Sequence, residues 1–358
     1  MKLKVVSVLC VLVLSFTLLS ACGKNLSSDS PEEIVNVPVY KSALTGLPVE
    51  SEEISNRRPV AIMINNIKKA LPQYGISKAS IVFEALAEGG ITRLLAVYDD
   101  LEGISQIGTV RSARPYYLDF AESVDAIYVH IGGSPEAYDQ IKSRGMDSFD
   151  LIEGRNDSMY WRDKARIQQS GYEHSVFTSG DRIVEKITER GMRDTRSSSY
   201  GDVFNFSEDV VYEGSDALDI SAVFSPYKTG RYTYDEDIGV YRIEQYDTAH
   251  MDALVGSQIA FKNVFVLRMN SYMIKGDTAG RLRFDTVGSG DGMYFVNGTK
   301  TNFTWSKSSA AAPFVFTLPD GRELPVVPGD SYVAIVPLNA EVTVEGTVET
   351  TENAEENS

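Results

Sequence analysis

Arg111, Arg114 and His130 lie close together in the chain, in a stretch that begins I-G-T-V-R-S-A-R-P at Ile107 and continues to a strand ending in Y-V-H-I-G-G-S-P. Burying charged or polar side chains of this kind costs free energy unless they pair with an anionic group. Two arginines can hold a carboxylate or a phosphate through paired hydrogen bonds. The sequence therefore predicts a site for an anionic group, with His130 tuning it.

Gly132, Gly133 and Ser134 follow this histidine and lead into a helix that begins at Pro135. A strand that feeds two glycines and a helix N-terminus leaves backbone N–H groups at the positive end of the helix dipole, which suits an anion. Pro135 removes one of these donors. The same residues also fit a tight turn and a helix capped by Ser134. Together with the histidine and the arginines, they favour a binding pocket.

Glu84, Glu88 and Arg93 are expected to form the neighbouring wall. If Gly89-Gly90 are the two loop residues of a hairpin, Leu86 faces Arg93, and Arg93 becomes the diagonal neighbour of both glutamates on one sheet face. The glutamates could instead pair with Arg111 and Arg114 in an internal network, and the sequence leaves both readings open.

An enzyme is the alternative to a binding protein. Two carboxylates four residues apart on a strand lie about 13 Å apart, too far for either glycosidase geometry. A hydrolase of an envelope polymer could use His130 as acid/base, with the arginines stabilising negative charge. Arg162 and His174 could complete either the binding site or the hydrolase site. Neither Ser112 nor Ser134 lies in a nucleophile elbow.

Metal and cofactor chemistry have little support in the sequence. The three histidines, including His250, have no ligand spacing, so we expect no metal and no cofactor. His250 and Asp252 are expected in a surface loop. The formal charge of −16 argues against a nucleic-acid partner.

Helical and strand patterns alternate up to a polar break at 193–201, which favours an α/β arrangement. Strands and turns follow the break, among them the hairpin signal Asn297-Gly298. The expected fold class is α+β. It comprises an α/β-type N-terminal domain with a mixed sheet at 44–192, a smaller antiparallel β-rich C-terminal domain at 203–340, and a disordered acidic tail at 341–358.

The first 21 residues read as a signal peptide, with a basic start and an apolar stretch too short to span a membrane comfortably. Leu19-Ser20-Ala21-Cys22 resembles a bacterial lipobox. That resemblance implies export, cleavage before Cys22, acylation of Cys22 with chains such as palmitate, and anchoring at the extracytoplasmic face of the cell membrane. Residues 22–43 would be a flexible spacer. The remaining cysteine, Cys10, lies in the removed segment, so the mature fold has no cysteine for a disulfide.

Several motifs carry a family resemblance: T-G-L-P, R-P-V-A-I-M-I-N-N, A-L-A-E-G-G-I-T-R, R-S-A-R-P-Y-Y, H-I-G-G-S-P-E-A-Y, K-N-V-F-V, G-S-G-D-G, F-V-N-G and T-W-S-K. They resemble the YerB-like family of bacterial lipoproteins, whose function is unknown, and cover about Leu44 to Pro337. The resemblance implies a two-part architecture and a lipid-anchored place at the envelope. It supplies no catalytic residues.

We therefore expect a lipid-anchored extracytoplasmic protein of the cell envelope that binds an anionic envelope component or an envelope partner protein. The ligand-binding residues would be Arg111, Arg114, His130, Gly132, Gly133, Ser134, Glu84, Glu88 and Arg93. A hydrolase that uses His130 is the alternative. A chaperone or regulator of an envelope enzyme, which needs no pocket, is the third class.

Overall fold

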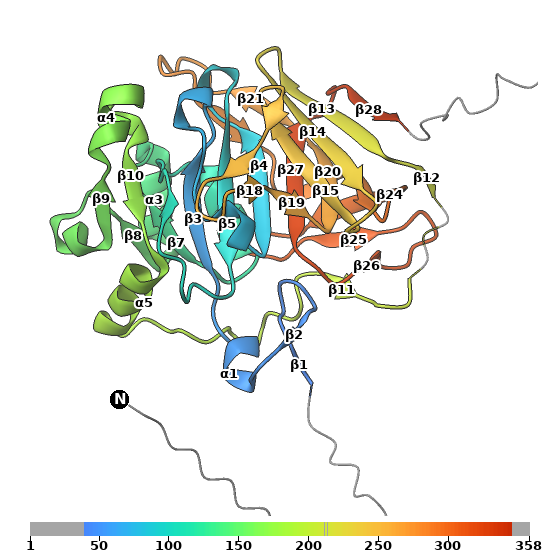
Figure 1. Cartoon of the computed structure of the whole chain (residues 1–358), viewed down its shortest axis with the longest axis horizontal. Coiled ribbons are helices and arrows are strands. Elements are labelled where there is room, and N and C mark those ends of the chain that lie inside the picture. Colours follow the sequence, from blue (N-terminus) through green and yellow to red (C-terminus); the bar gives the residue numbers. More distant parts are fainter. Residues whose placement is uncertain (1–38, 211, 213, 346–358) are drawn as a thin grey trace, which may run out of the picture. The chain divides into compact units, whose positions relative to one another are not determined.

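The computed structural model describes residues 39–210, 212 and 214–345 (Figure 1). The described residues from Val39 onward form one compact unit. The predicted signal peptide, Cys22, most of the predicted spacer and residues 346–358 lie outside the described residues. The fold begins slightly before the expected start at Leu44, because β1 (Tyr40–Lys41) already pairs with β2 (Pro48–Val49).

Five α-helices and five short 3₁₀-helices are found in the described part of the chain. The α-helices are α1 (Glu52–Ser55), α2 (Pro115–Glu122), α3 (Pro135–Arg144), α4 (Lys164–Ser170) and α5 (Gly180–Glu189). The 3₁₀-helices are η1 (Lys68–Ala70), η2 (Ile76–Lys78), η3 (Glu88–Gly90), η4 (Gly154–Met159) and η5 (Tyr172–His174).

The main sheet has eleven strands. In spatial order they are β12 (Ser215–Asp216), β24 (Thr299–Lys307), β23 (Gly288–Val296), β20 (Asn263–Met269), β27 (Ser331–Pro337), β4 (Ile81–Leu86), β5 (Thr92–Tyr98), β3 (Val60–Asn65), β7 (Ile127–His130) and β8 (Ser148–Asp150), with β25 (Val315–Thr317) beside β24.

A second sheet has six strands, and the remaining strands form smaller sheets. The second sheet contains β16 (Thr248–Ala249), β15 (Val240–Gln245), β14 (Lys228–Asp235), β13 (Asp219–Ser225) and β28 (Val342–Glu345), with β19 (Ala260–Phe261) beside β15. The smaller sheets contain β6 (Ile107–Gly108), β10 (Val176–Thr178) and β9 (Tyr160–Arg162); β11 (Asn205–Phe206) and β26 (Pro325–Val326); β17 (Met251–Asp252) and β18 (Ser257–Gln258); and β21 (Ser271–Met273) and β22 (Leu282–Phe284).

The main sheet joins the two parts that the sequence suggested as separate domains. Strand β27, from the C-terminal part, pairs in parallel with β4, from the N-terminal part. It also pairs in parallel with β20, so the C-terminal part is not purely antiparallel as expected. All but the last residue of β27 are buried. A strand buried on both faces needs hydrogen-bonding neighbours on both sides, and β4 supplies one of them.

The first part of the predicted disordered tail, 341–358, contains a strand. Residues Val342–Glu345 form β28, which pairs with β13 at the edge of the second sheet, so the prediction of disorder from 341 is wrong for these residues. Val342 and Val344 pack against the core, which explains why this part of an acidic segment is ordered.

Local helix and turn signals were read correctly. Helix α2 begins at Pro115, where the fixed φ of proline suits the first helical position, and ends at Glu122. Helix α3 begins at Pro135, with the Ser134 hydroxyl accepting a hydrogen bond from the Ala137 N–H. The turn at Asn297-Gly298, where both residues have positive φ, joins β23 to β24.

The predicted register of the hairpin between β4 and β5 is wrong by one residue. The loop has three residues, Glu88–Gly90, closed by a hydrogen bond from the Ala87 N–H to the Ile91 carbonyl. Arg93 therefore faces Ala85, and Leu86 faces Thr92. Because side chains alternate along a strand, a slip of one residue moves Arg93 and Glu84 to opposite faces of the sheet.

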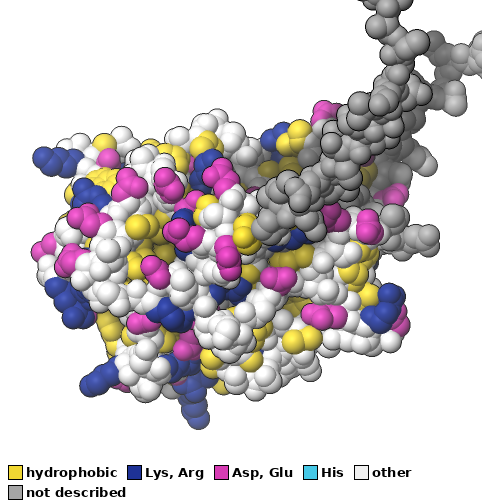
Figure 2. Space-filling view, turned by 90° about the horizontal axis from the view of Figure 1, so that it is seen from below, with side chains coloured by type: hydrophobic (Ala, Val, Ile, Leu, Met, Phe, Trp, Pro, Cys, Tyr) yellow, Lys and Arg dark blue, Asp and Glu magenta, His cyan; other side chains and the backbone are white. Residues whose placement is uncertain are grey.

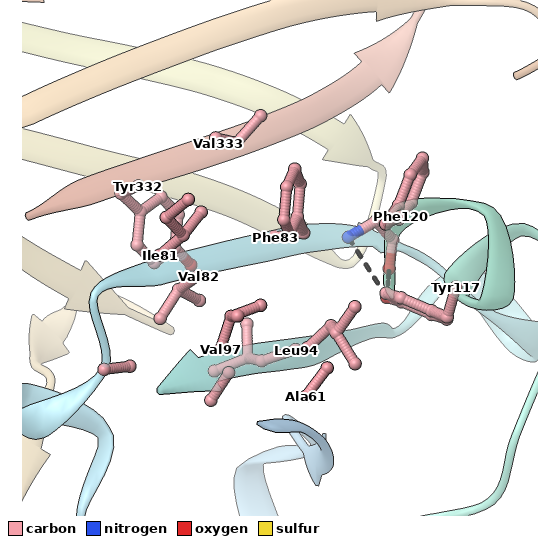
Figure 3. Close-up of a cluster of buried hydrophobic side chains, with 14 of the residues drawn as sticks. Ala61, Ile81, Val82, Phe83, Leu94, Val97, Tyr117, Phe120, Tyr332 and Val333 are labelled. Atoms are coloured by element: carbon pink, nitrogen blue, oxygen red, sulfur yellow. Dashed lines mark hydrogen bonds between the residues drawn. The ribbon is translucent and has the colours of Figure 1, made fainter. Parts of the chain in front are cut away.

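Each face of the main sheet around β4 is covered by a different layer. Helix α2 packs on one face, where the ring of Phe120 stacks on Phe83 and the Tyr117 hydroxyl accepts a hydrogen bond from the Ala85 N–H (Figure 3). The same hydroxyl donates to the Arg93 carbonyl at 2.6 Å and lies 2.9 Å from the Ala85 carbonyl. The second sheet packs on the opposite face, where Tyr232 contacts Tyr332 of β27. Burial of these aromatic side chains on both faces stabilises the sheet.

Candidate functional site

Most of the predicted site residues lie at one edge of the main sheet. Strands β3, β7 and β8 are parallel, and β4 runs in the same direction because both β3 and β4 are antiparallel to β5. The carboxyl ends of these four strands therefore meet at one edge, where helices α2 and α3 also begin. Open α/β sheets place their ligands at such an edge.

Glu88 holds two arginines at this edge. Its carboxylate lies 3.0 Å from Nη2 of Arg93 and also accepts a hydrogen bond from Nε of Arg114. The remaining guanidinium contacts go to backbone carbonyls: Arg93 donates to Ser112, and Arg114 donates to Ala113. The side chains of Arg93 and Arg114 are only 5% and 12% exposed. One carboxylate therefore serves two nearly buried cations.

Electrostatics at this pair of arginines favours an added negative charge. Burial alone would raise the pKa of Glu88, but the hydrogen bond from Arg114 and the charges of both arginines hold it below its ordinary value. Burial lowers the pKa of Arg93, and the charges of Arg114 and Arg111 lower it further. The guanidinium charges repel one another, and Glu88 offsets this only in part.

Arg111 contacts a different carboxylate, which the sequence reasoning missed. Its Nη2 lies 2.8 Å from Oε2 of Glu173 in η5, and Glu173 is 70% exposed. The hydrogen bond from Arg111 lowers the pKa of Glu173. Arg111 and Arg114 therefore do not form one clamp as the sequence suggested, because each is bound to its own carboxylate. Nothing in the spacing of the chain signals that η5 returns to Arg111.

His174 and Arg162 also lie at η5. A ring nitrogen of His174 lies 2.8 Å from the side-chain nitrogen of Asn65 at the end of β3. Burial lowers the pKa of His174, and the charge of Arg111 lowers it further. Arg162 donates to the carbonyl of Tyr172 and lies 3.6 Å from the centre of its ring. His174 therefore follows Glu173 in η5, and Arg162 of β9 contacts Tyr172, the residue before Glu173; their part in the site stays a prediction.

His130 is more enclosed than expected. It is 1% exposed, and its Nδ1 lies 2.8 Å from the Gly132 carbonyl and 3.9 Å from the Asp150 carboxylate. Burial lowers the pKa of His130, so its neutral form is favoured. The hydroxyl of Tyr138 donates to the same Asp150 carboxylate. His130 is thus a satisfied buried residue.

The backbone donors expected at Gly132, Gly133 and Ser134 are largely used inside the fold. The Gly132 N–H donates to the Asp150 carboxylate, and the Ser134 N–H donates to the Ala113 carbonyl. Gly133 forms a bridge with Ala113. These contacts hold the segment before α2 against the start of α3. The N–H groups of Gly132 and Ser134 are therefore engaged within the fold and are not open to an anion.

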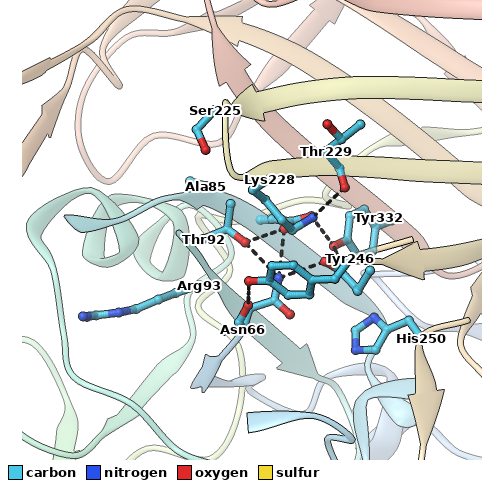
Figure 4. A network of polar contacts seen from close by, with 12 residues as sticks. Asn66, Ala85, Thr92, Arg93, Ser225, Lys228, Thr229, Tyr246, His250 and Tyr332 are labelled. Atoms are coloured by element: carbon cyan, nitrogen blue, oxygen red, sulfur yellow. Dashed lines mark hydrogen bonds and ion pairs between the residues drawn. The ribbon is translucent and has the colours of Figure 1, made fainter. Parts of the chain in front are cut away.

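Glu84 does not lie beside the arginines. It belongs to a buried network on the other face, where its carboxylate lies 3.0 Å from Lys228 Nζ and accepts hydrogen bonds from Asn66, Thr92 and Tyr332 (Figure 4). Arg93 extends away from this network in the same view. The shifted hairpin register explains the separation. The predicted row of Glu84, Arg93 and Glu88 is therefore wrong.

His250 and Asp252 are buried instead of lying in a surface loop, whereas Met251 between them is exposed. His250 is 1% exposed, with Nε2 2.6 Å from the Gln73 side-chain oxygen, and burial lowers its pKa to about 3. Asp252 is fully buried and accepts hydrogen bonds from the N–H groups of Gly75 and Ser77. The sequence around His250 and Asp252 is polar and lies next to a turn. It therefore does not indicate that Gln73, Gly75 and Ser77 of the N-terminal part bury these side chains.

The described part of residues 39–345 contains no group of side chains suited to binding a metal ion. No three His, Cys, Asp or Glu side chains gather there in a way that could hold a metal ion. No helix in the same part of the chain has the length and apolar character needed to cross a membrane.

Comparison with known proteins identifies the family. The family described as "Protein of unknown function (DUF3048) N-terminal domain" matches residues 44–193, and its C-terminal counterpart matches residues 220–333. The Bacillus subtilis (strain 168) protein named "Putative lipoprotein YerB" is 31% identical over 338 residues, which is 92% of this chain and 94% of that protein. The chain belongs to the YerB-like family.

A solved structure shows the same architecture in a YerB-like protein. The crystal structure of YerB from Bacillus subtilis is similar with a TM-score of 0.73 and 31% identity, covering 85% of this chain and 99% of that chain. YerB-like proteins thus have N- and C-terminal family regions, and here one continuous sheet links the two. The family is one of unknown function, so it assigns no role to the arginines.

Proposed function

We propose that the chain is a lipid-anchored protein of the cell envelope that binds an anionic group of an envelope component or partner protein at the carboxyl edge of its main sheet. The binding site is the carboxyl-edge cluster, which we define as Glu88, Arg93, Arg111, Arg114 and Glu173. It carries three positive and two negative side chains, a net charge of +1, in a chain with a formal charge of −16. This local excess of guanidinium groups is the observation that supports the proposal.

Arg111 is the group that can meet a ligand. Its side chain is 22% exposed, and its partner Glu173 is 70% exposed. Surface ion pairs of this kind contribute about 0–1 kcal/mol, so an incoming carboxylate or phosphate can displace Glu173 at little cost. Arg93 and Arg114 are less exposed and are held in place by Glu88 and by backbone carbonyls. Their charges would attract an anion at Arg111 without contacting it.

The proposed anchor follows from the N-terminal motif and from the relative. The lipobox-like Leu19–Cys22 precedes the folded part, and YerB carries the name of a lipoprotein. Acylation of Cys22 would tether the fold at the extracytoplasmic face of the membrane. Cys22→Ala is expected to move the protein from the membrane fraction to the soluble fraction and to abolish labelling by a palmitate analogue. Unchanged membrane retention would contradict the anchor.

A hydrolase that uses His130 as acid/base is not favoured. A general acid or base must reach the reacting atoms, and His130 is 1% exposed with its Nδ1 bound to a carbonyl. The lowered pKa of His130 comes from burial, which is common for a structural histidine. We therefore keep binding as the proposed activity.

Two opposite substitutions test the site. Glu173→Gln removes the internal competitor, so the affinity for inorganic phosphate or acetate, measured by calorimetry, is expected to rise about two- to fivefold. Arg111→Gln removes the contact itself and should weaken binding about tenfold or more. The matched control is the exposed pair formed by Arg283 and Glu136, which are 2.7 Å apart. Glu136→Gln and Arg283→Gln should leave the affinity unchanged, and an Arg111→Gln variant that binds like the parent refutes the proposal.

A further inference from the structure

A second candidate site lies at the opposite edge of the same sheet. A cavity of about 510 Å³ opens at the first residues of β3 and β7 and at the last residue of β5, namely Val60, Ile127 and Tyr98. Val60 and Ile127 are the amino ends of β3 and β7, whose carboxyl ends lie at the proposed anion site, and Tyr98 is the carboxyl end of the antiparallel β5. Cavities of roughly 300–1,000 Å³ are typical of small-molecule sites.

The floor of this cavity is apolar and rigid. Val60, Ile127 and Tyr98 are at most 3% exposed and belong to the main core. Leu101, which follows β5, and Ile187 of α5 complete the floor and are also buried. The apolar surface that a ligand could cover is chiefly that of Val184 of α5, which lines the same cavity and is 48% exposed.

The rim is strongly acidic. Seven carboxylates line the cavity, and its only lining cations are Arg57 and Arg58, so the formal charge of the lining is −5; the acids are Glu53, Asp99, Asp100, Glu102, Asp181, Glu185 and Asp194. Figure 2, which views the protein from the side of α1 and α5, shows acidic side chains around hydrophobic patches.

The two arginines do not neutralise this rim. Arg57 lies 2.6 Å from Asp100 and 3.9 Å from Glu53, so one positive charge is shared by two lining carboxylates. Arg58 is 7% exposed and pairs with Asp125 and Asp147, neither of which lines the cavity. Most of the lining carboxylates therefore have no cationic partner among the lining residues and are available to a cationic ligand.

We propose that this cavity binds a small organic ammonium compound with an apolar body, such as a diamine. The hydrocarbon part lies on Val184 and Ile187 of α5 and on Leu101, and the ammonium groups meet the carboxylates of α5 and of the loop after β5. This inference goes beyond the anion site, which it neither needs nor uses. Low-dielectric walls lined by one sign of charge concentrate ligands of the opposite sign.

The chain itself does not offer a suitable occupant. Residues 23–38 carry one lysine and three acids, and residues 346–358 carry four acids and no basic residue. A second copy of the chain carries a formal charge of −16 as well. All three would be repelled by the rim, so the charge complement must come from a separate cationic molecule.

Two probes of equal length separate charge from apolar contact. Calorimetric titration with 1,6-diaminohexane is expected to show binding, whereas the neutral 1,6-hexanediol should bind at least about tenfold more weakly. Equal affinity for both probes, or no binding of the diamine at millimolar concentration, would overturn the proposal. Binding of a lysine-rich peptide in place of the diamine would also overturn it, because that result indicates a protein partner.

A matched pair of double variants locates the site. Asp181→Asn with Glu185→Gln removes two exposed acids of α5 and should weaken diamine binding about five- to tenfold. Glu236→Gln with Asp237→Asn makes the same chemical change at exposed positions outside the cavity lining and should have no effect. Equal weakening by both double variants would show attraction to the acidic surface in general and would overturn the site. The phosphate affinity of the carboxyl-edge cluster should stay the same in all of them, so the two proposals fail separately.

Discussion

Replacing Lys228 by methionine is expected to destabilise the protein by about 3–5 kcal/mol. Lys228 of β14 lies 3.0 Å from Glu84 of β4, and neither side chain is exposed. The substitution keeps a long side chain of similar volume, so it removes the positive charge with little change in packing. It therefore isolates the cost of leaving a buried carboxylate without its cation.

The magnitude follows from what remains around Glu84. Three donors stay in place: the Asn66 amide at 2.9 Å, the Thr92 hydroxyl at 2.6 Å and the Tyr332 hydroxyl at 2.6 Å. They satisfy the carboxylate oxygens but do not balance the charge, so we expect the lower half of the range, about 3–4 kcal/mol. Adding Glu84→Gln removes the unpaired charge, and the double variant should recover at least half of the loss.

Equilibrium urea unfolding followed by tryptophan fluorescence measures this effect. The control is Lys41→Met, which breaks a lysine–glutamate pair of the same kind at the surface, where the side chains of Lys41 and Glu208 are 48% and 65% exposed. It should change the free energy of unfolding by less than about 1 kcal/mol. If Lys228→Met costs no more than Lys41→Met, or if the double variant is as unstable as the single one, the argument from burial is wrong.

Three further predictions concern titration and the arginine cluster. Burial lowers the pKa of His250 to about 3, below its ordinary 6.5, so the unfolded chain gains a proton first and stability falls as the pH drops from 6.5 towards 3. His250→Gln should flatten this fall in urea unfolding between about pH 7 and pH 4.5, and an unchanged slope would contradict the assignment. Burial, with the charge of Asp99, raises the pKa of Asp330 from 3.8 to about 7, so this residue favours the folded state only while protonated, and its support is lost as the pH rises through 7. Asp330→Asn should raise the melting temperature at about pH 8 but not near pH 4, whereas equal effects at both would exclude titration as the cause. Glu88→Gln leaves Arg93 and Arg114 without their carboxylate and should cost about 2–4 kcal/mol in urea unfolding; a cost under about 0.5 kcal/mol would show that the backbone carbonyls suffice.

The sequence reasoning located the candidate site mainly through residues that terminate strands and start helices. Pro115 and Ser134 set their helix starts through local chemistry, and Arg114 lies next to one of them. His130 ends β7 as expected. The shared direction of β3, β4, β7 and β8 then brings these ends to one edge, which is why the predicted residues lie near one another.

The partners of those residues could not be read in the same way. Glu173 reaches Arg111 from η5, which is 62 positions away in the chain. Lys228 reaches Glu84 across two layers of the fold. Such contacts depend on how the sheets pack, and no local pattern encodes them. The one-residue error in the hairpin register had a large consequence, because it assigned Glu84 to the wrong face.

The amino-acid sequence by itself determined the local elements of this protein: helix starts at prolines and capping serines, the Asn297-Gly298 turn, and the strands rich in apolar residues. These depend on backbone angles and hydrogen bonds within a few residues. Only the tertiary structure decided that β27 joins β4, which links both parts into one sheet, and that Glu88 is shared by two arginines. The physical reason is that burial and charge pairing are satisfied by whichever groups the packed layers bring together, at any distance along the chain.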